Sequence, residues 1–265
     1  MCAIDFDSMS DLLYDPWFYA ASIPAVMLVG FSKGGFGGAM ALIGVPLMAL
    51  VMSPVQAAAI MLPILLVMDA VSLWTWRGTY DRKMLGLMLP GALIGVAIGW
   101  ATAAFVTVAA VRLIIGIVSL TFFLRWLVQF LQKADQVARP HNAVRASFWA
   151  TISGFTSFVG HAGGPPYQIY ALQLGHSPAL YAGTSVIFFA IVNAVKVVPY
   201  FALGQFDTTN LSASAILMPV APIATLAGAW LVRRLRASIF YGFTYSMMFL
   251  VAIKLIYDGL IDIFG

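Results

Sequence analysis

The sequence contains few charged residues and a single cysteine, and each deficit excludes a class of protein. Only 9% of the residues are charged, whereas 62% are hydrophobic, and the mean hydropathy is +0.95. A chain with so little charge cannot cover the surface of a soluble domain, so we expect an integral membrane protein whose surroundings are the lipid bilayer. The lone Cys2 excludes a disulfide within one chain and any cysteine metal cluster.

Recognisable catalytic motifs are also missing. The histidines His141, His161 and His176 lack HExxH-type spacing, and neither a GxSxG motif nor a phosphate-binding P-loop occurs. We therefore predict that the protein is not an enzyme and has no catalytic residues, metal site or cofactor. The net charge of +4 resides mostly in loops, where it indicates membrane orientation and not nucleic-acid binding.

What the sequence does contain is an internal repeat. Gly30-Phe31-Ser32 recurs as Gly154-Phe155-Thr156, and Ser53-Pro54 recurs as Ser177-Pro178, each 124 residues later (154 − 30 = 124). Each copy begins with a glycine-rich break in apolar sequence, at 33–38 and at 160–166. Interrupted helices at corresponding positions of two halves point to the binding site of a transporter.

The apolar runs define five elements in each half. The expected elements are 17–32, 37–52, 55–76, 84–105 and 108–130, then 146–158, 163–174, 180–201, 211–231 and 239–261. The first two of each half are short and form either a re-entrant hairpin or two tilted spans. We expect an all-α polytopic membrane protein with about 8–10 membrane elements in one transporter domain, 1–265: repeat one is about 17–131, repeat two about 146–262, and the connector 132–145.

Positive charge predicts the orientation of these elements. Basic residues gather in three connections, at 77–83, 133–145 and 233–236. Placing these connections in the cytoplasm puts both termini outside. An odd number of membrane crossings per half, which holds whether the short pair is a hairpin or two spans, then inverts the second half relative to the first. A parallel repeat would place the basic loop 77–83 on the same side as 204–210, which has no lysine or arginine.

The two breaks are the candidate binding site. A half-helix starting at Gly37 or Gly163 would direct free N–H groups and its positive dipole end towards an anion. Alternatively, glycines only allow close helix packing, which is the interpretation we favour for Gly91, Gly95 and Gly99. The predicted substrate-binding residues comprise the breaks, their polar flanks and two residues on a neighbouring helix: Ser32, Lys33, Gly37, Gly38, Thr156, Ser157, His161, Gly163, Gly164, Asn193 and Lys196.

Four ionisable side chains in apolar sequence each allow more than one role. A lysine inside the membrane costs roughly 3 kcal/mol, so Lys33 either faces a cavity or extends to an interface. Lys196 either lines the site or lies near the outer interface. Asp69 carries a proton, pairs with a lysine or bonds a neighbouring helix, and we favour pairing. His161 binds an anion, titrates, or bonds a carbonyl group.

These residues resemble the TauE/SafE sulfite exporter family. The resemblance rests on the break at 33–38 leading to 45–47 and on the break at 161–165. It continues through 182–185, Asn193, Lys196, Tyr200, Gly204 and Asp207. It implies a multi-pass protein of the bacterial inner membrane that exports or takes up sulfite, sulfonates or other small organosulfur anions.

Together, these observations predict an exporter that binds a small sulfur oxyanion between the two breaks near the membrane midplane. The alternatives are a proton-coupled carrier, an importer of another small anion, a membrane-embedded enzyme and a subunit of a larger complex. The expected partners are the anion and the bilayer, and a homo-oligomer is compatible with the sequence.

Overall fold

The chain folds into a bundle of helices. The structure is a computed structural model and describes residues 13–37, 40–102, 108–131 and 138–264. No strand occurs in these ranges, so the predicted all-α class is confirmed. The helices are α2 (Pro16–Lys33), η1 (Met40–Ile43), α3 (Gly44–Met48), α4 (Pro54–Thr75), α5 (Arg82–Ala101), α6 (Val108–Leu131), α7 (Ala143–Gly160), α8 (Gly164–Ala171), η2 (Leu172–Leu174), α9 (Pro178–Ala202), α10 (Thr208–Leu217), α11 (Val220–Arg234) and α12 (Ala237–Phe264).

Several of these helices can cross a membrane. In the part of the chain that the structure describes, α4, α5, α9 and α12 are long and apolar enough to do so. The pair α10 and α11 adds a fifth span if its 48° bend is taken as a break within one span. The bend coincides with Pro219, the N-cap residue of α11, which has no N–H group to continue the helical ladder.

The repeated sequence pairs are helix N-caps. Ser53 precedes α4 and Ser177 precedes α9, and each hydroxyl accepts a hydrogen bond from a backbone N–H three residues later. Each cap is followed by proline at the first helical position, where a missing N–H costs nothing. Asp81 and Asp207 cap α5 and α10 in the same way. The repeat therefore starts the same helices in both halves.

The packing between the halves is reciprocal. α5 of the first half packs against α7 of the second, and α11 of the second half packs against α2 of the first. Glycines provide the closest approach: a Cβ at Gly154 would lie 2.0 Å from the Ala92 carbonyl oxygen, and one at Gly228 would lie 2.1 Å from that of Phe31. This packing of each half against a helix of the other is compatible with an inverted repeat. The boundaries of the two repeats and of the connector stay predictions.

The row of Gly91, Gly95 and Gly99 on α5 is a packing surface, as predicted. Cβ atoms added at these positions would meet Ser147, Thr151 and Phe158 of α7. Small residues let the backbones of membrane helices approach closely. The interpretation favoured for these three glycines is therefore confirmed.

Gly95→Ala is expected to destabilise the protein, because its Cβ would lie 2.0 Å from the Thr151 carbonyl oxygen. Overpacking of this kind costs about 1–3 kcal/mol. Gly86→Ala on the same helix is the matched control, since nothing lies within 4 Å of its added Cβ. Thermal unfolding in detergent should show a lower midpoint for Gly95→Ala alone. Equal midpoints for the two variants would contradict the close contact between α5 and α7.

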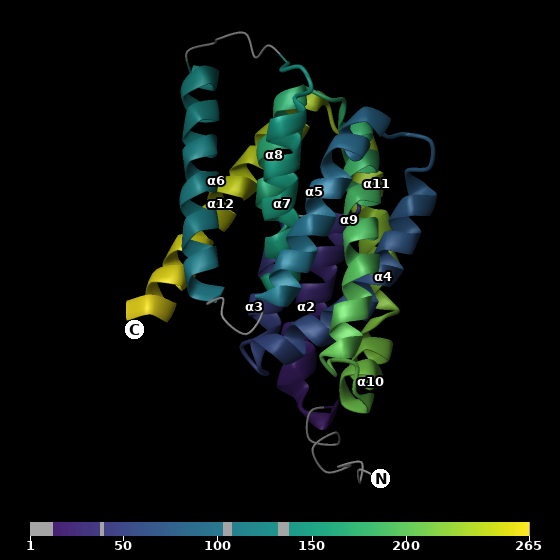
Figure 1. The fold of residues 1–265 in the computed structure, drawn as a ribbon. Helices are drawn as coiled ribbons and strands as arrows, with labels where there is room; N and C mark the ends of the chain where they lie inside the picture. The colour runs from purple at the N-terminus through teal and green to yellow at the C-terminus, as the bar shows by residue number, and fades with distance from the viewer. Residues whose placement is uncertain (1–12, 38–39, 103–107, 132–137, 265) are drawn as a thin grey trace.

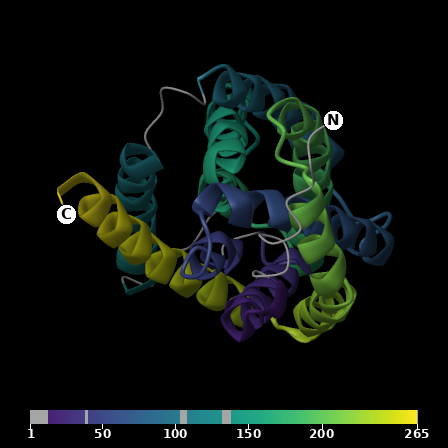
Figure 2. The ribbon, with the colours of Figure 1, turned by 90° about the horizontal axis from the view of Figure 1, so that it is seen from below.

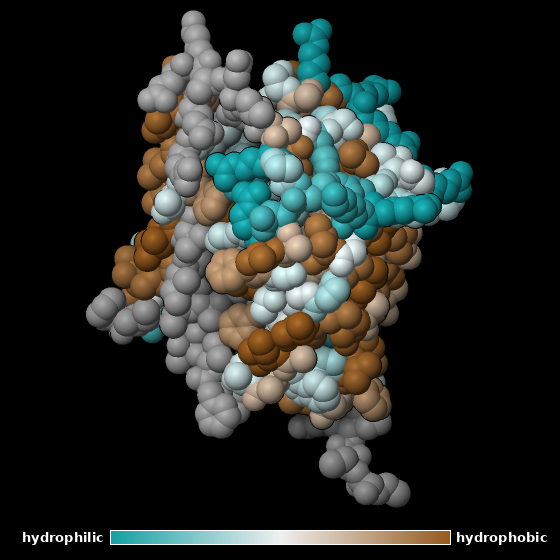
Figure 3. Space-filling view, turned by 45° about the horizontal axis from the view of Figure 1, so that its top comes forward, coloured by the Kyte–Doolittle hydropathy of each residue, from teal (hydrophilic) through white to brown (hydrophobic). Residues whose placement is uncertain are grey.

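The connections that carry basic residues lie at one end of the bundle. Figure 1 shows that the α4–α5 and α11–α12 connections and the start of α7 lie at the upper end, whereas the start of α2 and the end of α12 lie away from it. Hydrophilic residues gather at that end, above a band of hydrophobic ones (Figure 3). The helices α6 and α12 pack together at one edge of the bundle (Figure 1 and Figure 2). The bundle is that of a multi-pass membrane protein, while the cytoplasmic assignment of the basic end stays a prediction.

Candidate functional site

Both glycine-rich breaks form helix ends in the interior, but their geometry differs. α7 ends at Gly160, and His161 follows with φ 53° in the left-handed region, which residues other than glycine seldom adopt. The N–H of His161 bonds the Ser157 carbonyl and that of Ala162 bonds the Thr156 carbonyl, closing the helix end. The next helix, α8, begins at Gly164 with Gly163 as its N-cap residue, within one residue of the prediction.

In the first half, a half-helix beginning at Gly37 is not found. Gly35 and Gly37 have φ angles of 152° and 68°, which lie in the region that favours glycine. After them, a 3-10 turn precedes α3, an α-helix of five residues that starts only at Gly44. The prediction for this break was wrong because glycines with positive φ cannot begin an α-helix. Gly38 lies outside the described residues.

Lys33, Asp69 and Asn193 form one buried polar contact between the halves. The Lys33 Nζ atom lies 2.6 Å from Asp69 Oδ1, and Asn193 donates from Nδ2 to Asp69 Oδ2, also at 2.6 Å. Asp69 is in α4 and Asn193 is in α9, at equivalent positions of the repeat 124 residues apart. Of the three roles left open for Asp69, the structure shows pairing with a lysine and a bond to a neighbouring helix.

Lys196 occupies a different environment from Lys33. It is 0% exposed, and its Nζ atom donates to the carbonyl and the hydroxyl of Ser157 at 3.1 and 3.2 Å. It also lies 3.1 Å from His161 Nδ1. Among the residues that the structure describes, no carboxylate lies within ion-pair distance of Lys196. Its hydrogen-bond partners there are Ser157 and His161.

His161 is held on its other side as well. Its Nε2 atom lies 3.3 Å from the Ala58 carbonyl oxygen and 3.3 Å from the hydroxyl of Tyr200. Tyr200 lies one turn after Lys196 on α9, so it shares a face with that lysine. It was named at first only within the family resemblance, although its spacing from Lys196 could have identified it.

The two halves make equivalent contacts between the break and the long helix, but the lysine lies on the break in the first half and on the long helix in the second. Ser72 donates to the carbonyl of Lys33 at 3.2 Å, and Lys196 donates to that of Ser157 at 3.1 Å. In the repeat, Ser72 is equivalent to Lys196, and Lys33 is equivalent to Ser157. One lysine thus projects from the break of the first half, and the other from the long helix of the second half. The polar cluster is asymmetric although its backbone contacts repeat.

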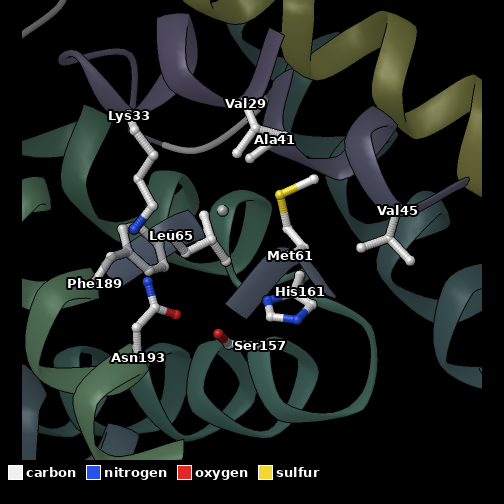
Figure 4. A pocket seen from close by; sticks show the side chains of 11 residues that line it. Val29, Lys33, Ala41, Val45, Met61, Leu65, Ser157, His161, Phe189 and Asn193 are labelled. Atoms are coloured by element: carbon white, nitrogen blue, oxygen red, sulfur yellow. The ribbon is translucent and has the colours of Figure 1, made fainter. Parts of the chain in front are cut away.

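A pocket of about 400 Å³, its open mouth included, lies beside this cluster. Four predicted site residues line it with polar groups, Lys33, Ser157, His161 and Asn193, and a fifth, Gly164, lines it as well. The remaining wall is apolar: Val29, Ala41, Val45, Met61, Leu65 and Phe189. In Figure 4, the ends of Lys33 and Asn193 lie near each other, with Ser157 and His161 along the same side. N–H and O–H groups beside apolar surface suit an anion with an apolar part.

The other predicted residues support the pocket and do not line it. Thr156 donates its hydroxyl to carbonyl groups of its own helix and of Ala162. Ser32, its repeat partner, is fully buried with no partner for its hydroxyl among the described residues. Gly37 and Gly163 are packed closely: added Cβ atoms would meet Tyr181 and Ser153, respectively. Lys196 reaches the pocket only through Ser157 and His161.

Comparisons with known proteins identify a family. Residues 22–255 match the family model described as sulfite exporter TauE/SafE. The match includes both breaks, α4 and α9. No curated protein and no solved structure matches the chain.

Proposed function

The chain belongs to the sulfite exporter TauE/SafE family, and on that basis we propose that it carries a small sulfur oxyanion, sulfite or a sulfonate, through the pocket between the two breaks. Membership of this family and the apolar helices make the protein a multi-pass membrane transporter. We propose three further things: the choice of anion, the residues that bind it and the outward direction of transport.

The observation that supports the proposal is the charge balance of the buried cluster. Asp69 offsets Lys33, whereas Lys196 has no carboxylate partner among the described residues. A buried charge without a partner is costly, and inside a membrane it commonly marks a substrate or ion pathway. A bound anion would supply the missing negative charge.

The lining of the pocket supports the substrate class. Lys33, Ser157, His161 and Asn193 line the pocket with polar groups, and Met61 and Phe189 are among the apolar residues that line it too. The sulfur oxygens would face the donors, and the organic part of a sulfonate would face the apolar wall. Sulfite would use the polar side alone.

Transport by the purified protein tests this function. Liposomes that contain only this chain should take up labelled sulfite, or a sulfonate such as sulfoacetate, faster than protein-free liposomes. The control anion is chloride, which lacks oxygen atoms for several donors to share. The proposal is wrong if a broad panel of sulfur oxyanions shows no flux above protein-free liposomes.

We expect the membrane potential to drive export. With a negative cytoplasm, an outward-moving anion gains about 2.3 kcal/mol per charge per 100 mV. A doubly charged sulfite gains roughly 4.6 kcal/mol, enough for a gradient of more than about 1,000-fold. Asp69 is already engaged by Lys33 and Asn193 at 2.6 Å, so this proposal assigns it no role as a proton carrier.

The measurement imposes a potassium diffusion potential on these liposomes without a pH gradient. Flux should increase with the potential and remain unchanged when a pH gradient is added at zero potential. The proton-coupled alternative predicts the reverse: flux that ignores the potential, follows the pH gradient, and loses that dependence in Asp69→Asn.

A further inference from the structure

A second polar cluster lies at the basic end of the bundle, away from the pocket. It contains Asp81, His141 and His176, which come from three different connections. The Nε2 atoms of His141 and His176 each lie 3.1 Å from the same atom, Asp81 Oδ2. The cluster plays no part in the proposed anion site.

Asp81 is held so that one carboxylate oxygen remains for the histidines. Its Oδ1 atom accepts the N–H of Met84 as the N-cap of α5. Its own N–H donates to the hydroxyl of Thr184 on α9 at 2.9 Å. The loop lies directly on that helix, because a Cβ at Gly183 would meet the Thr79 carbonyl oxygen at 1.7 Å. These contacts hold Asp81 Oδ2 in a fixed position facing the two histidines.

The two histidines are also fixed by their surroundings. The His176 carbonyl accepts a hydrogen bond from the Tyr241 hydroxyl at 2.6 Å. Near His141, the Arg139 N–H donates to the Gln173 carbonyl at 2.8 Å, which joins the connector to the segment before His176. Both Nδ1 atoms are buried without a hydrogen-bond partner among the described residues, so Nε2 makes the polar contact of each ring.

We propose that Asp81, His141 and His176 bind a divalent transition-metal ion of the zinc class through Oδ2 and the two Nε2 atoms. Ligand atoms about 2.0–2.2 Å from a tetrahedral ion lie about 3.3–3.6 Å from one another, and the 3.1 Å contacts found here need to open only slightly to reach that spacing. Two imidazole nitrogens with one carboxylate oxygen form a ligand set typical of such ions.

The surroundings suit the remaining requirements of a metal site. The His141 side chain is 21% exposed, so water can reach the cluster and act as the fourth ligand. The three ligands belong to the first half, the connector and the second half. A bound ion would therefore cross-link the halves at this end.

The test titrates Zn²⁺ into the purified, tag-free protein in detergent and measures binding by calorimetry. All variants are made in a Cys2→Ser background, because this substitution removes the only thiol that could bind Zn²⁺. We expect one ion per chain and a higher unfolding midpoint with Zn²⁺. His141→Ala and His176→Ala should each weaken binding at least about tenfold. His161→Ala is the matched control, since it removes the third histidine, which lies outside the cluster, and should leave the affinity for Zn²⁺ unchanged.

A second measurement needs no substitution in the cluster. Co²⁺ in the tetrahedral site should give intense visible absorption bands that Zn²⁺ abolishes. The proposal fails if these bands are missing, or if His141→Ala and His176→Ala bind Zn²⁺ as well as the background protein does. The cluster would then be a carboxylate hydrogen-bonded by two histidines only.

Discussion

Lys196→Met is expected to reduce sulfur-oxyanion transport about 30-fold or more while leaving the protein at least as stable as before. Loss of one of two interacting buried charges costs about 2–5 kcal/mol in binding, and here the other charge would be the substrate, which Lys196 would meet across Ser157 and His161. Without substrate, the same change removes a buried amino group that has no described carboxylate within ion-pair distance, and this relieves the cost of burying its charge. Methionine retains the length of the apolar stem.

The matched control is Lys254→Met, which removes a lysine whose side chain is 49% exposed and paired with Asp258 on α12. It should transport at the normal rate. Initial rates over a range of substrate concentrations, with thermal unfolding of the same preparations, distinguish the two effects. Normal transport by Lys196→Met would mean that the substrate does not use this charge. Equal losses of transport in both variants would mean that each lysine acts only through the overall charge of the protein.

Asp69→Asn is expected to have the largest effect on stability. It leaves Lys33 buried and unpaired, and breaking a buried ion pair from one side costs about 3–5 kcal/mol. Asp258→Asn makes the same chemical change in the exposed pair on α12, where such pairs contribute about 1 kcal/mol or less. Unfolding in detergent should therefore separate the two asparagine variants clearly.

A double variant tests whether the charge imbalance is the cause. Lys33→Met with Asp69→Asn removes both charges, so it should recover most of the stability that Asp69→Asn loses. Its affinity for the anion should remain low, because Lys33 lines the pocket. A double variant as unstable as Asp69→Asn alone would mean that the carboxylate acts through Asn193 and not through Lys33.

Several features could be predicted from the sequence because they depend on residues close together in the chain. The pairs Ser53-Pro54 and Ser177-Pro178 begin α4 and α9, since a capping hydroxyl and a proline act within one helical turn. The row of glycines on α5 indicated a packing face because their spacing alone puts them on one side of a helix. The start of the half-helix after the first break was predicted wrongly, because positive φ at Gly35 and Gly37 delays it.

The residues that the sequence missed meet only in three dimensions. No spacing relates Asp81, His141 and His176, which come from three connections, and their sequence suggested no metal site. Thr156 has the polar character expected of a binding residue but uses its hydroxyl to close its own helix end. Composition could not distinguish such a residue from Ser157, its neighbour, which lines the pocket.

The sequence by itself determined the membrane class, the helix starts at Ser53-Pro54 and Ser177-Pro178, and the family, because composition, short-range hydrogen bonding and aligned motifs are properties of contiguous residues. Only the tertiary structure decided how the buried charges are paired. Lys33 and Lys196 look alike in the sequence, yet Asp69 lies within reach of Lys33, while Ser157 and His161 surround Lys196. Packing of α2 against α4 and of α7 against α9 sets those distances, and the strength of an interaction between charges depends on distance and on burial.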